Sequence, residues 1–223
     1  MNKKDIVYKR IFVWSGLLRI SHWVFAISIV ILLLTGTYIH DPLITTKWAE
    51  FKPLHLMAIL RYYHFSAGFV LIGALLIRIY LLLFGNRYER CWNFLPLNLR
   101  NIKSLFHNIK FYLYLTDKPA RRLGHKVIAG IMYFILFICA VIMAVSGIYL
   151  LYPEAGTVSK VGIFFFGSQQ AARFMHYFLS WAFLFFIIFH LYLVVFNELK
   201  SHRAIISSIV SGSQFRPAEE VER

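Results

Sequence analysis

The sequence has few charged residues, little acid and little cysteine. Only 15% of its 223 residues are charged, whereas 59% are hydrophobic. This is far too apolar for an ordinary soluble domain, so a soluble enzyme is nearly excluded. The two cysteines, Cys91 and Cys139, are too few and too far apart for a disulfide framework or a zinc site.

Acid is absent where it would matter most, in the long apolar runs. Four such runs contain no Asp or Glu, and each has at least the roughly 20 residues that a helix needs to cross a bilayer. The first run is too long for a cleavable signal peptide and lacks a small-residue cleavage site, so we expect it to remain as a span. The sequence predicts an all-α integral membrane protein, a four-helix bundle. The predicted spans are 18–39, 63–84, 127–151 and 174–196.

The excess of basic over acidic residues is distributed unevenly between the two sides of the predicted spans. The chain has 24 Lys and Arg against 10 Asp and Glu, a net charge of +14 that in a soluble protein would suggest a nucleic-acid partner. Here eighteen of the basic residues lie on one side of the predicted spans, in segments 1–19, 87–126 and 200–223, and five lie on the other. The positive-inside rule therefore predicts that both termini are cytoplasmic. No nucleic-acid partner is needed to explain the charge.

The connection between the second and third spans contains apolar residues at helical spacing, which predicts an extra helix lying on the cytoplasmic surface. The tail after the fourth span shows a similar, shorter pattern. We expect residues 1–215 to form one membrane domain and 216–223 a disordered tail. The two apolar sets are Ile102, Leu105, Phe106, Ile109 and Leu113, and Ile205, Ile206, Ile209 and Val210.

Four histidines lie in the predicted spans, where ionisable residues are rare and usually functional. Because successive spans run in opposite directions, position along each span gives depth. His64 and His176 start their spans near the outer side, whereas His22 starts its span near the cytoplasmic side. His190 follows His176 by fourteen residues, about 21 Å deeper on the same helix face, which brings it to the level of His22.

Two level pairs of histidines predict two stacked haems with bis-histidine ligation of the iron, His22 with His190 and His64 with His176. A zinc or copper site would instead gather three or four ligands at one height. No Cys-x-x-Cys-His motif occurs, so the haems would be bound non-covalently, as haem b. The alternative is that each histidine only bonds a neighbouring hydroxyl or backbone carbonyl.

Arginines near these histidines are candidates for pairing with haem propionates. Arg19, Arg61 and Arg173 each precede a proposed ligand by three residues and share its helix face. Arg78 lies inside the second span at the level of the inner pair, with no acid in any span to neutralise it. The alternative for all four is snorkelling to an interface. Gly36, at the outer level, could leave room for a macrocycle.

Short motifs occur along almost the whole chain, about residues 8–215. They are Arg19-Ile-Ser-His22-Trp23, Leu34-Thr35-Gly36, His64-Phe65-Ser66-Ala67-Gly68, Arg78-Ile79-Tyr80, Gly85-Asn86-Arg87-Tyr88, Gly124-His125 and His190-Leu191-Tyr192. Together these motifs resemble the cytochrome b subunit of membrane-bound Ni/Fe uptake hydrogenases, and the gamma subunit of formate dehydrogenase is a more distant likeness. One departure is that Phe174 and Tyr177 stand where that family leads us to expect a small residue and a basic residue.

This resemblance implies a subunit of a hydrogen:quinone oxidoreductase complex in the bacterial cytoplasmic (inner) membrane. It would anchor the Ni/Fe hydrogenase, take electrons from the iron–sulfur small subunit and through it from the large subunit, and pass them through two haem b groups to menaquinone or ubiquinone. It also implies the same ligand pairs, His22 with His190 and His64 with His176. The chain would be an electron-transfer subunit without a catalytic residue of its own.

Groups at the inner level could bind quinone or deliver protons to it, and His125, Tyr192 and His202 are the candidates. A partner other than hydrogenase stays open: formate dehydrogenase, another periplasmic oxidoreductase, or none, as in a stand-alone cytochrome of the b561 kind. A different class would be a small transporter or an anchor without haem. A proton-relaying transporter predicts acidic residues in the spans, and the sequence has none there.

Overall fold

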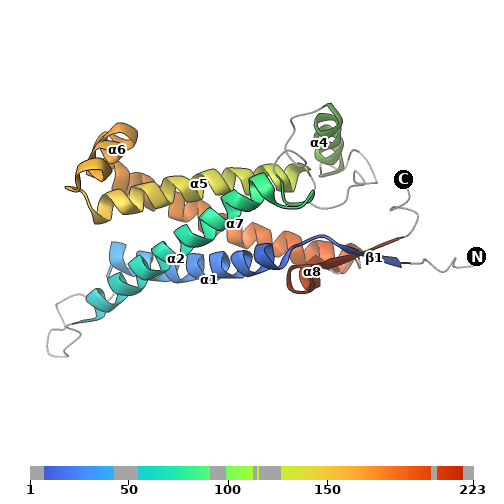
Figure 1. Cartoon of the computed structure of the whole chain (residues 1–223), viewed down its shortest axis with the longest axis horizontal. Coiled ribbons are helices and arrows are strands. Elements are labelled where there is room, and N and C mark those ends of the chain that lie inside the picture. Colours follow the sequence, from blue (N-terminus) through green and yellow to red (C-terminus); the bar gives the residue numbers. More distant parts are fainter. Residues whose placement is uncertain are drawn as a thin grey trace, which may run out of the picture. The chain divides into compact units, whose positions relative to one another are not determined.

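The computed structural model contains four long helices, each apolar enough over at least 18 residues to cross a membrane (Figure 1). The all-α class and the four spans predicted from the sequence are thus confirmed. The second and fourth helices begin seven and five residues before the predicted spans. The long helices are α1 (Gly16–His40), α2 (Leu56–Phe84), α5 (Val127–Leu151) and α7 (Gln169–Ser201). The residues that the structure describes are 8–42, 55–90, 99–112, 115, 127–201 and 205–217.

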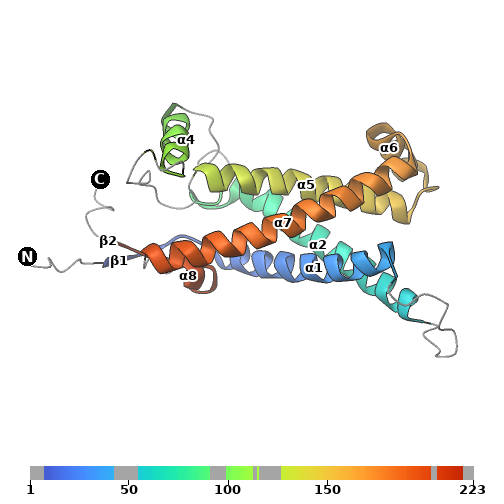
Figure 2. The same cartoon turned by 180° about the vertical axis from the view of Figure 1, so that it is seen from behind.

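Three shorter helices join or follow the spans. α4 (Leu99–Tyr112) and α8 (Ile205–Ser211) confirm the two helices predicted outside the membrane segments, although Leu113 lies outside the described residues. α6 (Gly156–Phe166) was not predicted; it lies between α5 and α7 in the chain and is visible at one end of both in Figure 2. Gly162 lets α6 pack directly on the buried Tyr149 ring of α5, because a Cβ there would overlap that ring.

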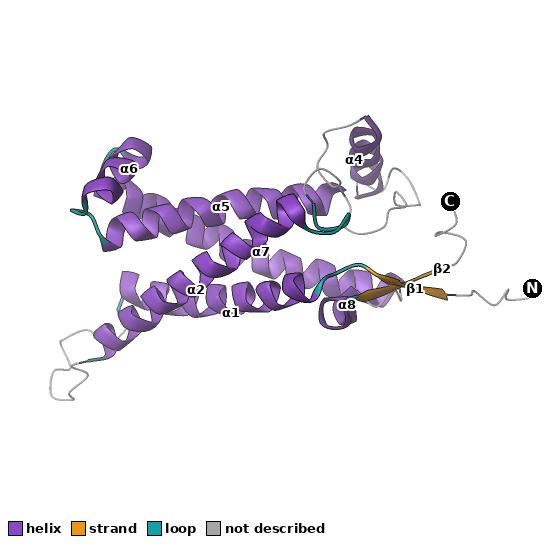
Figure 3. Ribbon diagram, viewed as in Figure 1, coloured by secondary structure: helices purple, strands orange, loops and turns teal. Residues whose placement is uncertain are grey.

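A small antiparallel sheet joins the two ends of the chain, and the sequence analysis missed it (Figure 3). Strand β1 (Tyr8–Phe12) pairs with β2 (Ser213–Pro217). Tyr8 is opposite Pro217, so the paired strand extends two residues into the segment 216–223 that was expected to be disordered. Residues 218–223 lie outside the described part of the chain.

The chain forms two compact units, each described here by itself. Unit 1 comprises Met1–Arg19, Arg78–Leu136 and Ile188–Arg223, and therefore holds both ends of the chain. Unit 2 comprises Ile20–Ile77 and Phe137–Ile187. The core of unit 2 is built largely from small and aliphatic side chains of α2, α5 and α7, as in membrane helices that pack closely. Its buried members include Ala67, Leu71, Ala74, Leu75, Ala140, Ala172 and Leu179.

Unit 1 is organised around the buried carboxylate of Glu89, only 1% exposed and the one buried acid among the described residues. Its two oxygens accept hydrogen bonds from the backbone N–H groups of Ser15, at 2.8 Å, and Asn86, at 3.1 Å. Ser15 directly precedes α1, so the carboxylate also lies at the positive end of that helix dipole. The Asn86 side chain in turn donates to the carbonyl oxygen of Val13, at 3.0 Å. Glu89 thereby ties the α2 terminus to the start of α1.

The turn between α8 and β2 closes the same region. Gly212 has a positive φ of 82°, and its carbonyl oxygen accepts hydrogen bonds from the N–H groups of Val13 and Trp14, at 2.8 and 3.1 Å. A Cβ at this position would lie 2.8 Å from the carbonyl oxygen of Trp14, so the turn requires glycine. The indole N–H of Trp14 donates to Ser208 of α8, at 3.3 Å.

We expect Glu89→Ala to lower the free energy of unfolding of the purified protein by about 1–3 kcal/mol, because two partly buried backbone N–H groups would lose their acceptor. Thermal unfolding in detergent, followed by circular dichroism, measures this. Glu154→Ala removes an exposed carboxylate and is the matched control, for which we expect no change. Equal melting temperatures for the two variants would contradict the role given to Glu89.

Candidate functional site: paired histidines in the spans

His64 and His176 face each other in unit 2. His64 is the ninth residue of α2 and His176 the eighth residue of α7, so each lies about two turns inside its helix rather than at its start. Their imidazole centroids are 6.4 Å apart and the ring planes are inclined by 60°. Both rings are partly buried. The structure therefore brings together the two histidines that the sequence assigned to the outer pair.

Each of these histidines is bonded through Nδ1 to a hydroxyl group on a neighbouring helix. Nδ1 of His64 lies 2.9 Å from Oγ1 of Thr35 in α1, and Nδ1 of His176 lies 2.9 Å from Oγ of Ser146 in α5. Thr35 is 6% exposed and Ser146 is fully buried. Because both hydroxyls use Nδ1, Nε2 is the nitrogen that each ring offers to a further partner.

Glycines next to these hydroxyl residues give the rings their space. A Cβ on Gly36 would lie 3.2 Å from Cε1 of His64, and a Cβ on Gly147 would lie 3.3 Å from Cε1 of His176. The sequence analysis assigned Gly36 to making room for a macrocycle. The structure places the imidazole ring of His64 itself against Gly36, and room for a macrocycle at this level stays a prediction.

The spacing of the two rings suits one metal ion between them. Metal–imidazole bonds are about 2 Å long, so two rings that ligate one ion from opposite sides have centroids roughly 6 Å apart. The observed 6.4 Å agrees with this value. Metal-ligating histidines are usually neutral, with the other ring nitrogen hydrogen-bonded, as Nδ1 is here. The donor set at His64 and His176 therefore fits a bis-histidine haem.

The other two histidines of the spans belong to different units, so their predicted pairing stays a prediction. His190, in unit 1, has its Nδ1 atom 3.4 Å from the hydroxyl of Tyr133 in α5, and the two rings meet edge to face. His22, in unit 2, is partly buried and contacts Trp23 edge to face with centroids 5.5 Å apart.

The four candidate arginines have different surroundings. Arg19 uses one terminal guanidinium nitrogen to donate to the carbonyl oxygen of Val210, while its Nε is buried without a hydrogen-bond partner in the described part of the chain. Arg61 is exposed on α2. Arg173 is exposed on α7 and lies 3.5 Å from the side-chain oxygen of Gln170. Arg78 is partly buried within α2.

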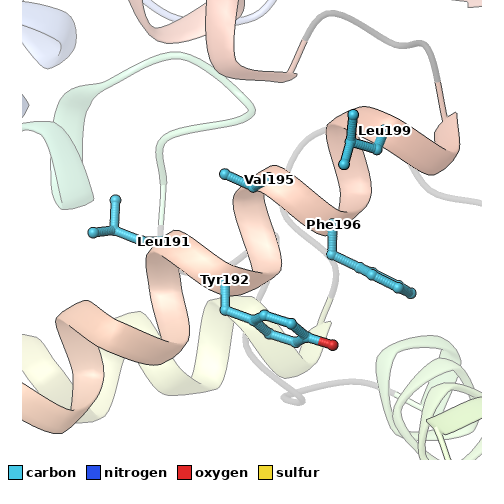
Figure 4. Close-up of a pocket in the computed structure, with 5 residues that line it drawn as sticks. All are labelled: Leu191, Tyr192, Val195, Phe196 and Leu199. Atoms are coloured by element: carbon cyan, nitrogen blue, oxygen red, sulfur yellow. The ribbon is translucent and has the colours of Figure 1, made fainter.

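Of the three quinone candidates, the structure describes one. Tyr192 lies on α7 and lines a shallow apolar groove, in which its ring stacks on Phe196 with centroids 5.9 Å apart (Figure 4). His125 and His202 lie outside the described residues.

Tyr177, which stands where the resemblance implies a basic residue, takes part in an aromatic contact in unit 2. Its ring stacks on His40, at the end of α1, with centroids 4.0 Å apart and planes inclined by 20°. Phe174 is 66% exposed on the same helix and stacks on Phe178. An aromatic contact between α1 and α7 thus lies one residue after His176, where the resemblance implied a basic side chain.

Apolar spanning helices with a facing pair of histidines define a multi-pass helical membrane protein of the kind that holds haem between its helices. Comparison with known proteins is in agreement. The sequence model of a family described as "Prokaryotic cytochrome b561" matches residues 13–212. The chain therefore belongs to the prokaryotic cytochrome b561 family, and its cofactor is haem b.

Several curated proteins are similar over most of their length. A probable Ni/Fe-hydrogenase B-type cytochrome subunit of Azotobacter vinelandii is 33% identical over 210 residues, covering 91% of this chain and 87% of that protein. A probable Ni/Fe-hydrogenase 1 B-type cytochrome subunit of Escherichia coli K12 is 30% identical over 211 residues, covering 90% and 89%. A probable Ni/Fe-hydrogenase B-type cytochrome subunit of Rhodobacter capsulatus is 28% identical over 221 residues, covering 95% and 84%.

Several residues of this site were missed by sequence reasoning. Neither Thr35 nor Ser146 was considered as a partner of a histidine, nor was Tyr133, and Gly147 was not singled out. The signal was present: a hydroxyl residue followed by glycine precedes a span histidine twice, by 29 residues for Thr35 and by 30 for Ser146. These distances link neighbouring helices, so helix periodicity alone does not reveal them.

We expect Gly36→Val and Gly147→Val each to weaken haem binding, by about tenfold or more, because a branched side chain would push the adjacent imidazole out of position. The haem b content per chain after purification measures this. Gly73→Val is the matched control on α2, since among the described residues a Cβ there would have open space around it beyond its own stretch of helix backbone. Equal haem loss from all three variants would contradict a specific role for Gly36 and Gly147.

Proposed function

We propose that this chain is the membrane-anchoring dihaem cytochrome b subunit of a Ni/Fe hydrogenase. It takes electrons from the iron–sulfur small subunit, and through it from the large subunit, and passes them through two haems to the quinone pool. The observation that carries the proposal is the facing pair His64 and His176. Both Nδ1 atoms are hydrogen-bonded to hydroxyl groups, and the distance between the ring centroids suits ligation of one iron. The names of the similar proteins support the choice of partner.

In this proposal His64 and His176 would hold the iron of the outer haem, and His22 and His190 that of the inner haem. The inner pair rests on sequence spacing, and the hydroxyl of Tyr133 beside Nδ1 of His190 supports it. Four arginines are assigned to the propionates, where bidentate charged hydrogen bonds are strong. They are Arg19, whose buried Nε has no hydrogen-bond partner among the described residues, and Arg61, Arg78 and Arg173.

The proposed orientation places both termini in the cytoplasm, with the protein in the bacterial inner membrane. Eighteen of the 24 Lys and Arg residues lie in the terminal segments and the connection 87–126, and positive charge favours the cytoplasmic side. The outer haem then lies near the periplasm and the inner haem near the cytoplasm. Membrane lipid surrounds the spans, whose large apolar side chains are widely exposed.

The chemistry divides between the cofactor and the chain. Haem, when bound, supplies reversible one-electron transfer at iron. The chain holds the iron ligands, fixes their orientation through hydroxyl groups and excludes water by burial. Quinone reduction takes up two electrons and two protons, so groups at the inner level must deliver protons from the cytoplasm. His125, Tyr192 and His202 are assigned to quinone binding and proton delivery.

One alternative within the same chemistry is a stand-alone cytochrome, which the description of the family as cytochrome b561 favours. Co-purification separates the two functions. Affinity purification of the tagged chain from mild detergent should bring down a Ni/Fe hydrogenase, identified by mass spectrometry and hydrogen-dependent dye reduction. A chain that carries haem but no hydrogenase would favour the stand-alone function.

We expect His22→Ala or His190→Ala to abolish hydrogen-dependent quinone reduction and to leave hydrogen oxidation with an artificial dye intact. The reason is that loss of the inner haem would stop electron transfer from the hydrogenase to quinone without affecting hydrogen oxidation itself. Membranes assayed with quinone and with dye provide both rates. His107→Ala, at an exposed position of α4, is the control and should keep both activities. Quinone reduction that survives in both ligand variants would exclude the proposed inner pair.

We expect Arg78→Leu to lower the midpoint potential of the inner haem, because a nearby positive charge stabilises the ferrous state. Redox titration of the haem absorbance measures the shift, and Arg78→Lys should retain most of the wild-type potential. If Arg78→Leu leaves both haem potentials unchanged, the guanidinium does not act on the inner haem.

A further inference from the structure

Thr35 and Ser146 are built into unit 2 in the same way. Each belongs to a hydroxyl–glycine dipeptide, Thr35-Gly36 in α1 and Ser146-Gly147 in α5. Each hydroxyl bonds Nδ1 of a histidine on the next long helix at 2.9 Å, and each glycine lies against Cε1 of the same ring. Two similar arrangements thus support the two facing imidazoles.

The direction of these hydrogen bonds follows from the proton inventory. A hydroxyl has one proton to donate. Oγ1 of Thr35 lies 2.6 Å from the carbonyl oxygen of Ile31, and Oγ of Ser146 lies 3.1 Å from that of Met143. A carbonyl oxygen only accepts, so each hydroxyl donates its proton to its own helix. Its oxygen is then left to accept a hydrogen bond from the histidine.

The consequence is a fixed tautomer on both rings. If the hydroxyl oxygen accepts, Nδ1 of His64 and Nδ1 of His176 must carry the proton, because a neutral imidazole has one N–H group. Nε2 of each ring then has its lone pair free for a metal. An accepting partner at Nδ1–H also makes the ligand more basic.

We propose that Thr35 and Ser146 are positioning residues that hold His64 and His176 in the Nδ1–H tautomer and at a fixed ring angle, so that both Nε2 atoms are directed to one haem iron. This rests on the proposed function, in which the two histidines ligate the outer haem. The more basic ligands favour ferric iron, so the two hydroxyls lower the potential of that haem. Gly36 and Gly147 admit the rings to hydroxyl contact.

If Thr35 and Ser146 had a purely structural role, their hydroxyls would make the same hydrogen bonds to backbone carbonyl oxygens but would have no effect on the iron. Thr37 provides that comparison on the same helix: its hydroxyl donates to the carbonyl oxygen of Leu34 at 2.9 Å, and its side chain is exposed. Thr37→Val therefore removes one hydroxyl from α1 while leaving the hydrogen bond of His64 in place.

The test uses the purified, haem-loaded protein in the variants Thr35→Val, Thr35→Ser, Ser146→Ala and Thr37→Val. The readouts are the two haem midpoint potentials, the low-spin ferric EPR g values and the rate of haem transfer to apomyoglobin. In Thr35→Val and in Ser146→Ala we expect one haem to shift to a higher potential, to change its g values and to be lost about 10- to 100-fold faster. Thr35→Ser and Thr37→Val should match the wild type.

Unchanged potentials and g values in both Thr35→Val and Ser146→Ala would overturn the inference. The same shifts in Thr37→Val would do so as well, because they would reflect loss of any hydroxyl from the spans. Failure of the proposed function is seen separately, with His64→Ala: if that variant retains both haems, His64 is not a ligand. If Thr35→Val does not accumulate, Ser146→Ala, which removes a single oxygen atom, decides the question.

Discussion

An imidazole in the hydrocarbon region needs a hydrogen-bond partner for its N–H group, and the rest of unit 2 follows from how that need is met. The partners are hydroxyls on other helices: Thr35 of α1 for His64 of α2, and Ser146 of α5 for His176 of α7. Each bond fixes the height and rotation of one helix against the other. The two rings then face each other at 6.4 Å, and that separation suits a shared iron.

Hydroxyl bonding and metal ligation are compatible, although the sequence analysis treated them as alternatives. Imidazole has two nitrogens, so a hydrogen bond from a hydroxyl group at Nδ1 leaves Nε2 available to bind a metal.

Unit 1 is held together differently, because it contains segments from both ends of the chain together with the end of α2. The buried carboxylate of Glu89 and the β1–β2 pairing join these segments with backbone hydrogen bonds.

Hydropathy and charge predicted the four spans, α4 and α8, because each of these helices has a local pattern of apolar residues in its own sequence. They did not predict α6, which is too short for a spanning pattern, nor the pairing of β1 with β2, whose partners stand at opposite ends of the sequence. Histidine depth predicted that His64 and His176 meet. Thr35 and Ser146 were missed because a hydroxyl in an apolar helix has no local signature, and its partner lies on another helix.

The central claim is that one chain holds two haem b groups, each between two histidines. A pyridine haemochrome count per chain on the purified protein, together with its reduced-minus-oxidised spectrum, tests it most directly. The account predicts two haems per chain with b-type α bands and no covalently attached haem. A count of one would contradict one of the two histidine pairs, and a count of zero would contradict the account as a whole.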